Sequence, residues 1–331
     1  MEYRTLGHSG LKVSRACLGG MNFGGAADAP CGEADALTII DAFLAAGHNF
    51  IDTADIYTGG QSEEVIGRAI RARRDQVVIA TKAFLPTGRG PNDRGLSRLH
   101  LTRALDASLA RLGVDYVDLY QCHKPDIDTP IEETMDTLAG FVRAGKVRYI
   151  GCSEFTGAQI VEAQWAASRA GGPRFISLQP RYSLIARSIE VDVLPTCARH
   201  GLGTLIYSPL GGGMLTGKYR RDEPPAKDTR FARWAASRDI AAKTRNFDIV
   251  DTLLQVAAEL GTNPDAVAIA WCLTRDHITS VIVGPRTLEQ LNQNLAGFSL
   301  ALPDEAIEAL TRASNPDLDG PRSYPWPMAR G

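Results

Sequence analysis

Short apolar runs alternate with amphipathic stretches along most of the chain, and this pattern is the first guide to its fold. The runs recur roughly every 30 residues, a spacing typical of repeated strand–helix units that build a parallel sheet. Eight runs are predicted to be strands, and eight favours a closed (β/α)8 TIM barrel over an open sheet. These predicted strands are residues 16–18, 49–51, 77–81, 117–121, 149–152, 175–178, 203–207 and 280–283.

The remaining pattern predicts a hairpin and several helices around the strands. Residues 3–13 contain two short strand-like stretches around a Gly-rich turn, which predicts an N-terminal β-hairpin that plugs one end of the fold. Apolar residues at helical spacing predict helices over 36–46 and 99–112, each followed by a terminating glycine. Ser62 is expected to cap the start of another helix, and Pro130 opens a further one, with acidic residues in its first turn.

Two long segments interrupt the regular spacing. They are residues 218–244, after the seventh predicted strand, and the tail 315–331, which is rich in proline and aromatic residues. Long loops in a compact domain are usually functional or disordered. We therefore expect long loops at the carboxyl-terminal face of the barrel. No linker divides the chain, so a single domain is expected over residues 1–331.

Composition narrows the class of protein. The chain has 331 residues, of which 44% are hydrophobic and 22% charged, and its formal net charge is −2. This balance predicts neither a nucleic-acid nor a membrane partner, and no apolar run reaches the roughly 18 residues of a membrane span. The N-terminus lacks a signal-peptide pattern, and the six cysteines form no C-x-x-C pair, so reduced thiols in a cytoplasmic protein are expected. Cys31, in a Gly/Ala-rich loop, is the thiol expected to be exposed.

Four polar side chains stand at or just beyond predicted strand ends. Asp52 and Tyr57 follow the second predicted strand, Lys82 follows the third, and His123 follows the fourth. Because the carboxyl ends of barrel strands meet at the catalytic mouth, we expect the four to lie together. A lysine in a partly dry site needs an opposite charge, for which Asp52 is the candidate, and Lys82 is expected to lower the pKa of the Tyr57 phenol. Tyr57 would then be an acid usable near neutral pH, with His123 donating a hydrogen bond to a substrate carbonyl.

Each of these residues has a simpler interpretation on its own, as a structural ion pair, a core phenol or a hydrogen-bonded histidine. Their arrangement at successive strand ends is what singles them out. The stretch 49–57, Asn-Phe-Ile-Asp-Thr-Ala-Asp-Ile-Tyr, resembles the active-site strand of the aldo-keto reductases, and the resemblance runs almost from end to end of the chain. It implies the barrel fold and carbonyl reduction with a nicotinamide cofactor, with the same four residues as the catalytic tetrad.

The same resemblance implies a cofactor site in the second half of the chain. Ser153 and Gln179 would hydrogen-bond the nicotinamide carboxamide, and the Tyr207 ring would stack on the nicotinamide. The alternatives are a strand-end cap for Gln179 and a core aromatic for Tyr207. The further residues expected to bind the cofactor are Glu154, Ser208, Pro209, Leu210, Gly211 and Lys218.

The loop after the eighth predicted strand matches the family's adenosine-phosphate end. Barrels commonly bind phosphate there through loop amides and a helix N-terminus. Arg286 is expected to contact a 2′-phosphate through bidentate hydrogen bonds, which favours NADPH over NADH; a surface ion pair with Glu289 is the alternative. Gly284, Gln290 and Asn294 match the same end of the cofactor.

One position departs from the family pattern. The family usually has Asn after the serine at position 153, whereas this chain has Glu154. An ionised carboxylate only accepts hydrogen bonds, so Glu154 is expected to bind the carboxamide NH₂ and to favour the oxidised cofactor. The substrate is specified less closely, as an aldehyde or ketone with an apolar body. The residues expected around it are Met21, Phe23, Phe84, Trp234, Tyr324 and Trp326.

Three functions are compatible with the sequence. The leading one is an NADPH-dependent reductase of a small carbonyl compound. The second is an NADPH-binding regulatory protein with little turnover, because the sequence also resembles potassium-channel β-subunits. The third is a lyase that forms a Schiff base through Lys82. A P-loop is rejected because Tyr219 stands where that motif needs Ser or Thr, and the six histidines have no metal-ligand spacing.

Overall fold

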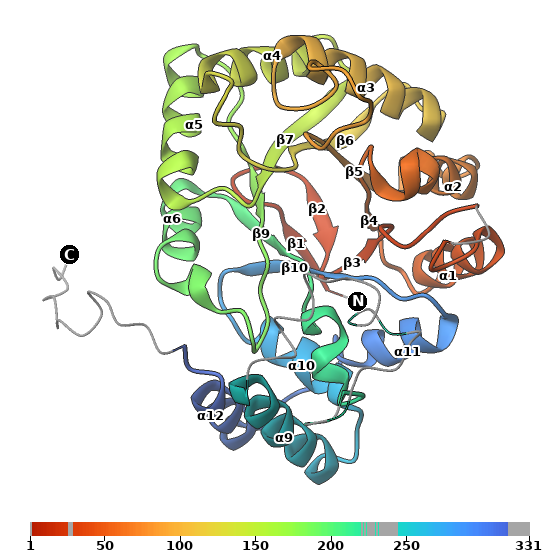
Figure 1. Ribbon diagram of the computed structural model, residues 1–331, viewed down its shortest axis with the longest axis vertical. Helices are drawn as coiled ribbons and strands as arrows, with labels where there is room; N and C mark the ends of the chain where they lie inside the picture. Colours follow the sequence, from red (N-terminus) through yellow and green to blue (C-terminus); the bar gives the residue numbers. More distant parts are fainter. Residues whose placement is uncertain are drawn as a thin grey trace, which may run out of the picture.

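The chain folds into a closed parallel β-barrel (Figure 1), which confirms the predicted (β/α)8 TIM barrel. The computed structural model describes residues 2–25, 29–219 and 244–316, together with residues 221, 223, 229 and 231. The barrel strands are β3 (Ala16–Gly19), β4 (Phe50–Asp52), β5 (Val78–Ala83), β6 (Val117–Cys122), β7 (Val147–Ser153), β8 (Ser177–Gln179), β9 (Gly203–Ile206) and β10 (Ile278–Val283). The barrel closes because β10 pairs in parallel with both β3 and β9.

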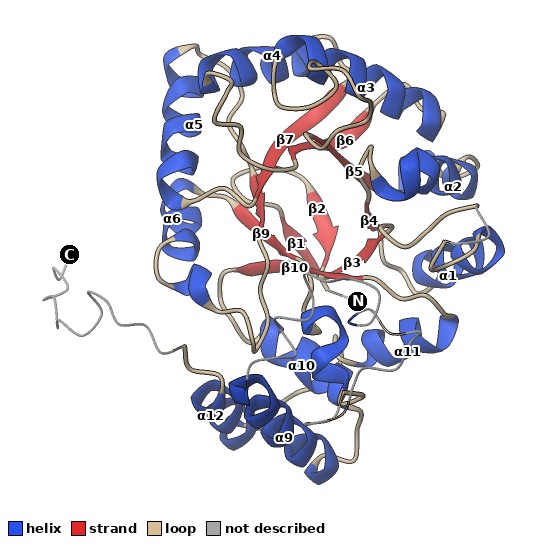
Figure 2. Cartoon of the chain, in the orientation of Figure 1, coloured by secondary structure: helices blue, strands red, loops and turns tan. Residues whose placement is uncertain are grey.

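Helices enclose the strands in an outer ring (Figure 2). They are α1 (Glu33–Ala45), α2 (Gln61–Ile70), α3 (Arg98–Leu112), α4 (Ile131–Arg143), α5 (Gly157–Arg169), α6 (Val193–His200), α9 (Thr244–Glu259), α10 (Pro264–Leu273), α11 (Leu288–Ala296) and α12 (Asp304–Ala313). The predicted helices 36–46 and 99–112 correspond to α1 and α3, and Gly113 ends α3 with a left-handed φ of 65°. Among the described residues, no helix is both long enough and apolar enough to cross a membrane.

Alternate residues of each strand point to opposite sides of the barrel wall, and this decides which side chains reach the interior. In β5, Ala80 belongs to the cluster inside the barrel, whereas Ile79 and Ala83 belong to the core between the strands and the helices. By the same alternation Lys82 faces inward and Thr81 faces outward. Every residue of β5 is buried, because both faces of the wall are covered. This explains the uninterrupted apolar runs in the sequence.

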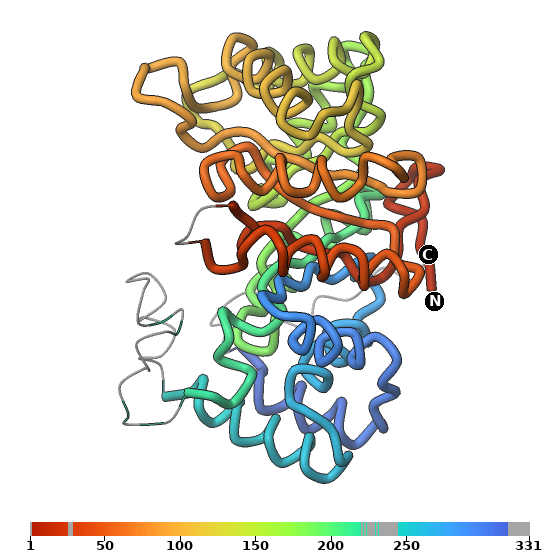
Figure 3. Tube along the Cα trace, turned by 90° about the vertical axis from the view of Figure 1, so that its right-hand side faces the viewer, coloured from red at the N-terminus to blue at the C-terminus, as the bar shows by residue number. Residues whose placement is uncertain are grey.

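An antiparallel hairpin closes the amino-terminal end of the barrel, as predicted. Its strands are β1 (Tyr3–Thr5) and β2 (Lys12–Ser14). Leu6 and Val13 are fully buried and belong to the cluster inside the barrel, so the hairpin fills the interior at its amino-terminal end. The side view in Figure 3 shows this end of the molecule with the N-terminus on the right. The carboxyl ends of the strands meet at the opposite face.

Ser62 does not cap a helix, contrary to the prediction. The N-cap position of α2 is Gly60, which has a left-handed φ of 93°, and no side chain caps the helix. The Ser62 hydroxyl instead donates to the carbonyl of Gly20 at 2.8 Å and hydrogen-bonds the Thr53 hydroxyl at 2.7 Å. Ser62 therefore ties α2 to the chain just beyond β3 and β4, through one partner 42 positions away and another nine positions away.

Cys31 is buried, so the prediction of an exposed thiol is also wrong. The residue has 2% of its surface exposed and forms an isolated parallel bridge with Phe23. Burial raises the pKa of the Cys31 thiol to about 11. A thiol with such a pKa is protonated at neutral pH and is a poor nucleophile. The loop composition does not reveal this, because the burial depends on the pairing with Phe23 and on packing in the main core.

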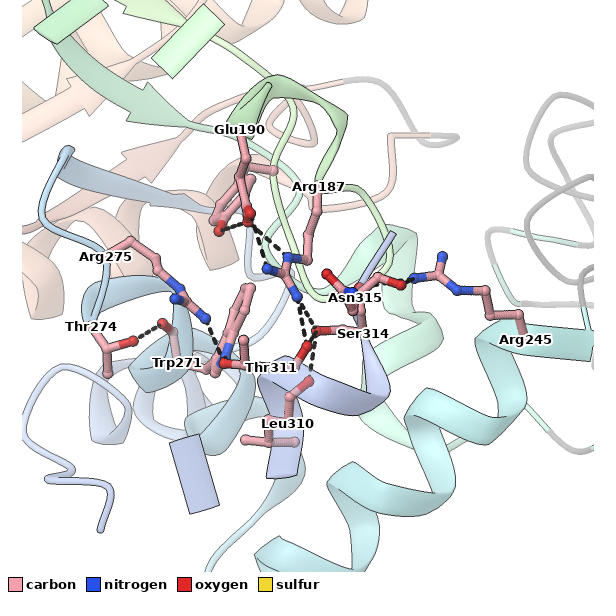
Figure 4. A network of polar contacts seen from close by, with 11 residues as sticks. Arg187, Glu190, Arg245, Trp271, Thr274, Arg275, Leu310, Thr311, Ser314 and Asn315 are labelled. Carbon is pink, nitrogen blue, oxygen red and sulfur yellow. Dashed lines mark hydrogen bonds and ion pairs between the residues drawn. The ribbon is translucent and has the colours of Figure 1, made fainter. Parts of the chain in front are cut away.

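A buried arginine fastens the C-terminal helix to the barrel (Figure 4). Arg187 forms a two-pronged ion pair with Glu190, at 2.7 and 2.9 Å. It also donates to the Thr311 carbonyl at 2.8 Å and to the Ser314 hydroxyl at 2.9 Å. Its guanidinium lies 5.3 Å from the ring centroid of Trp271 in α10. Since the last carbonyls of a helix have no partner within the helix, a cation at the end of α12 is stabilising.

We expect Arg187→Ala to destabilise the protein far more than loss of an exposed arginine. Arg187 is 7% exposed, and its removal takes a donor from α12 and a cation from Glu190. Breaking a buried pair of this kind costs roughly 3–5 kcal/mol. The control is Arg143→Ala, because Arg143 forms an exposed pair with Asp136 at 3.9 Å, and such pairs contribute about 0–1 kcal/mol. Denaturant unfolding measures both, and equal losses would contradict the assigned role.

Candidate active site

The buried ammonium of Lys82 is the centre of the site. Lys82 is fully buried in β5. Its Nζ donates to Oδ2 of Asp52 at 2.6 Å, to the Thr53 carbonyl at 2.8 Å and to the Tyr57 hydroxyl at 3.3 Å. Burial by itself lowers the pKa of Lys82, but Asp52 and Tyr57 outweigh it, so this pKa lies above its ordinary value. Lys82 therefore stays ionised in a dry position because it has acceptors on several sides.

Two amides hold the second oxygen of Asp52. Gln121 of β6 and Gln179 of β8 each donate Nε2 to Oδ1 of Asp52, at 3.1 and 2.8 Å. The amide nitrogen of Gln179 donates to Asp52 and also to Oε1 of Gln121 at 3.5 Å, so both of its hydrogens have partners and the carbonyl oxygen Oε1 is the atom left for a ligand. The predicted contact of Gln179 with a carboxamide is thereby restricted to an interaction with the carboxamide NH₂.

Gln121 belongs to the site although no motif marks it. Its partner Asp52 is 69 positions away in the chain, and barrel closure brings the two together. A signal was present in the strand pattern, because Leu119 of β6 faces the barrel interior and Gln121 follows two residues later on the same face. A polar side chain on the inner face of an apolar strand needs a hydrogen-bond partner inside the barrel.

Tyr57 begins the 3₁₀ turn Tyr57–Gly60. Besides contacting Lys82, its ring meets the His123 imidazole edge-on, with the centroids 5.7 Å apart. Burial is the largest influence and raises the pKa of Tyr57 above its ordinary value, while Lys82 opposes the rise. Lys82 does lower the pKa of Tyr57, as predicted, but the loss of water around the phenolate outweighs the attraction of the lysine, so the phenol is a weaker acid than the prediction of an acid usable near neutral pH assumed.

His123 lies beside Tyr57 and is uncharged. Burial, together with the positive charges of Lys82 and Lys124, lowers the pKa of His123 to about 3. Within the described residues, Nδ1 of His123 is buried with no hydrogen-bond partner. A neutral imidazole donates from one nitrogen and accepts at the other. His123 is thus able to donate a hydrogen bond to a carbonyl oxygen without bringing a second positive charge next to Lys82.

Three residues other than glycine have left-handed backbone conformations among the described residues. They are Thr58, Glu154 and Ser208, with φ values of 48°, 61° and 58°. Each costs of order 1–3 kcal/mol, and such residues cluster at functional sites. Asparagine adopts this conformation more readily than glutamate, which gives a physical reason for the family's usual Asn at position 154. The residues that immediately precede them are Tyr57, Ser153 and Tyr207.

The residues predicted to hold the nicotinamide lie next to one another. Ser153 donates its hydroxyl to the carbonyl of Gln179 at 2.8 Å. Glu154 accepts from the N–H of Arg181 at 3.2 Å. Burial, followed by the Glu154 charge, raises the pKa of Tyr207. The Glu154 charge therefore acts on the tyrosine that is expected to stack on the nicotinamide, an effect that the sequence did not predict.

A tight turn after β9 carries further predicted cofactor residues. The N–H of Gly211 donates to the Ser208 carbonyl at 2.9 Å. Gly211 has a φ of 57°, and a Cβ there would lie 2.4 Å from the Ile185 side chain, so this position requires glycine. Lys218 is exposed, with its ammonium 5.4 Å from the ring centroid of Tyr219. The predicted cofactor residues in this segment are Ser208, Pro209, Leu210, Gly211 and Lys218.

The segment after β10 leads into the N-terminus of α11. The N–H of Arg286 donates to Oε1 of Gln290 at 2.9 Å, and Thr287 caps the helix. Arg286 is half-buried, and no ion pair among the described residues joins it to Glu289. The alternative explanation of Arg286 as a surface ion pair is therefore removed.

Two further features of this segment fit the adenosine end of a dinucleotide. Asn294 is 4% exposed, and its Oδ1 is buried without a hydrogen-bond partner in the part of the chain described. An acceptor in this state suits the exocyclic amine of adenine, which is a donor. Gly284 is exposed, and a Cβ there would meet Nδ2 of Asn22 at 3.5 Å, an ordinary contact, so the backbone is open to a ligand.

The structure places only some of the residues predicted to line the substrate pocket. Met21 and Phe84 are half-buried, near the ends of β3 and β5. Phe23 is fully buried in the main core, so its ring presents no surface to a substrate, and its predicted place in the pocket needs this correction. Its bridge with Cys31 explains the burial, because it draws the loop after β3 against the core. Trp234, Tyr324 and Trp326 lie outside the described residues.

The family comparison agrees with this geometry. The model of the Aldo/keto reductase family matches residues 15–315. This chain belongs to the aldo/keto reductase family. The match spans the whole described barrel and confirms the resemblance drawn from the sequence. Members of this family are generally oxidoreductases of small carbonyl compounds that use a nicotinamide nucleotide.

Relatives of this aldo/keto reductase carry two kinds of name. It is 40% identical over 327 residues to a probable voltage-gated potassium channel subunit beta of Oryza sativa subsp. japonica, covering 95% of this chain and 97% of the relative. It is 38% identical to the uncharacterized oxidoreductase YrpG of Bacillus subtilis (strain 168), covering 98% and 100%. It is 34% identical to versiconal hemiacetal acetate reductase of Aspergillus parasiticus, covering 94% and 96%.

We expect His123 to remain neutral throughout the range from pH 5 to 8. Its pKa of about 3 in the folded protein lies below the ordinary 6.5, so the unfolded chain takes up a proton that the folded protein does not. Folding stability is therefore lost as the pH falls from 6.5 towards 3. Imidazole NMR signals, assigned with a His123→Asn variant, measure the titration directly. A His123 signal that titrates near pH 6.5 would contradict the neutral assignment.

Proposed function

We propose that this aldo/keto reductase reduces an aldehyde or ketone to an alcohol, with NADPH as the hydride donor and Tyr57 as the general acid. The observation that carries the proposal is the contact between the Tyr57 hydroxyl and the buried ammonium of Lys82, at 3.3 Å. A phenol beside a buried cation and a neutral imidazole is suited to proton transfer to an oxygen that gains negative charge. The four candidate catalytic residues are Asp52, Tyr57, Lys82 and His123.

Each residue has a definable part in this reaction. The bound nicotinamide would supply the hydride. Tyr57 gives its proton to the carbonyl oxygen, and Lys82 stabilises the phenolate that remains. His123 donates a hydrogen bond to the same oxygen and orients the substrate. Asp52 keeps Lys82 ionised and fixed, so that the positive charge is in place before the substrate arrives.

NADPH is proposed as the cofactor because of the chemistry around Arg286. The guanidinium of Arg286 is half-buried, lies next to a helix N-terminus and forms no ion pair with Glu289 among the described residues. Such a group suits a phosphate. The unpartnered Oδ1 of Asn294 suits adenine. Ser153, Gln179 and Tyr207 would hold the nicotinamide, with Oε1 of Gln179 accepting from the carboxamide NH₂. The buried thiols support the proposal of a reducing, cytoplasmic setting.

A second proposal is an NADPH-binding regulatory protein with little turnover. It is motivated by the relatives named as potassium channel subunits, such as the one from Oryza sativa subsp. japonica. A Schiff-base lyase is disfavoured, because the raised pKa of Lys82 keeps the amine protonated and non-nucleophilic.

Oxidation of NADPH, followed by absorbance over a panel of aldehydes, ketones, quinones and sugars, separates reductase from regulator. No turnover with any of them, despite tight cofactor binding, would favour the regulator.

We expect Tyr57→Phe to abolish most of the turnover and to leave NADPH binding nearly unchanged. The change removes the proton donor and keeps the ring, and general acid catalysis contributes roughly 10²- to 10⁴-fold. Tyr116→Phe is the matched control, because the Tyr116 ring lies between Arg74 and Arg148, at 4.2 and 4.0 Å, before β6 begins. Steady-state kinetics and cofactor titration measure both variants. Turnover above about a tenth of wild type in Tyr57→Phe would exclude Tyr57 as the acid.

We expect Arg286→Ala to weaken NADPH binding and to leave NADH binding nearly unchanged. A hydrogen bond to a charged group contributes about 1.5–3 kcal/mol, which corresponds to roughly ten- to a hundredfold in Kd. Glu289→Gln is the control, because it removes a neighbouring charge that the proposal does not use. Fluorescence titration with both cofactors measures the effect. Equal weakening of NADPH and NADH would show that Arg286 only supports the loop.

A further inference from the structure

A second buried polar network lies on the outer side of the barrel wall. Thr81 of β5 donates its hydroxyl to Oε1 of Glu63 at 2.6 Å, and Arg111 of α3 donates to the other oxygen of Glu63 at 2.7 Å. Thr81 directly precedes Lys82 in β5, so the two networks share one strand and face opposite sides of it. Glu63 is fully buried in α2, and both of its oxygens have partners.

Asp55 borders this outer network and lacks such partners. The residue is 3% exposed, and within the described part of the chain both carboxylate oxygens are buried without a hydrogen bond of good geometry. The hydroxyl of Tyr120 in β6, a fully buried residue, has no partner among the described residues either. Buried polar groups normally have partners, so a carboxyl and a hydroxyl left over in one region need an explanation.

Burial and the Glu63 charge outweigh the groups that favour the ionised form of Asp55. Burial is the largest influence, the Glu63 carboxylate on α2 follows, and together they raise the pKa of Asp55 to about 7. Arg111 on α3, the Ile56 N–H and Lys82 on β5 act in the opposite direction. On β6, Tyr120 has its own pKa raised, first by burial and then by the Asp55 charge.

Asp55 is also joined to the catalytic side of the wall. Its N–H donates to the Lys82 carbonyl at 3.1 Å, and Tyr57 follows it by two residues. The ionised carboxylate of Asp55 raises the pKa of Tyr57, in addition to the larger effects of burial and Asp52. The protonation state of Asp55 therefore affects the pKa of Tyr57, the proposed general acid.

We propose that Asp55 is a positioning residue that takes up a proton from solvent in the folded protein and, through its charge, adds to the effects of burial and Asp52 that keep Tyr57 protonated. When protonated, Asp55 has a hydrogen-bond donor, and the Tyr120 hydroxyl, which also lacks a partner among the described residues and whose pKa responds to the Asp55 charge, is the candidate acceptor. When ionised, the Asp55 carboxylate repels the negative charge of the Tyr57 phenolate. Tyr57 therefore stays protonated to higher pH. The kinetic part of this inference rests on the proposed function; the proton uptake does not.

Infrared difference spectroscopy tests the proton site without substrate or cofactor. The protein is labelled with ¹³C-aspartate, and the carbonyl stretch of a protonated carboxyl group is followed as the pH rises from 5 to 9. We expect a wild-type band that disappears around pH 7 and is absent in Asp55→Asn. A band that persists in Asp55→Asn, or no band in the wild type, would overturn the proposal. Tyr120→Phe, which keeps the ring, should shift the pH at which the band is lost, and an unchanged pH would exclude Tyr120 as the partner.

The pH profile of the reductase tests the effect on Tyr57. In Asp55→Asn the opposing charge is gone, so the alkaline limb of kcat/KM should move to lower pH by a fraction of a unit. Glu64→Gln is the matched control, since Glu64 is exposed on α2 beside the buried Glu63. An unmoved limb in Asp55→Asn, with the infrared band present, would show that Asp55 binds a proton but does not act on Tyr57. If no substrate is reduced by any variant, the proposed function fails while the infrared result still decides the proton site.

Discussion

The buried charge of Lys82 is the interaction on which the site depends. An ammonium with no contact to water is stable only where acceptors surround it, and here they come from Asp52, the Thr53 carbonyl and Tyr57. These acceptors all belong to the short stretch that begins with the last residue of β4. Lys82 therefore holds the chain after β4 against β5, and the same contacts that satisfy the lysine place the phenol beside it. Asp52 in turn is held by two amides from other strands of the barrel, Gln121 of β6 and Gln179 of β8.

The closed barrel makes this arrangement possible because each strand presents two faces. The inner face of the barrel wall carries Asp52, Lys82 and the two glutamines, Gln121 and Gln179. These residues come from four strands spread along the sequence. The outer face carries the network of Thr81, Glu63 and Arg111 between the wall and the helices. Since β5 contributes to both, a change of charge on one side of the wall acts on the other over a short distance. The loop that contains Asp55 connects the two sides.

The two ends of the barrel serve different purposes. The hairpin fills the amino-terminal end with Leu6 and Val13, which seals the interior and stabilises it. At the carboxyl-terminal face, by contrast, Thr58, Glu154 and Ser208 have left-handed conformations that cost free energy. Such residues persist only where the surrounding structure holds them. The three strained residues thus lie at the end where ligands are expected.

The sequence alone determined the barrel, the hairpin and the position of the tetrad, because the repeat of strands and helices specifies where each strand ends. A residue at a strand end in a parallel barrel faces the mouth whatever its partners are, so Asp52, Lys82 and His123 were predictable. The tertiary structure decided the rest: the amide of Gln179 on Asp52, the inclusion of Gln121, the burial of Cys31 and Phe23, and the net rise in the pKa of Tyr57. These depend on which remote residues come into contact and on how much water they displace, and no local pattern in the chain encodes either quantity.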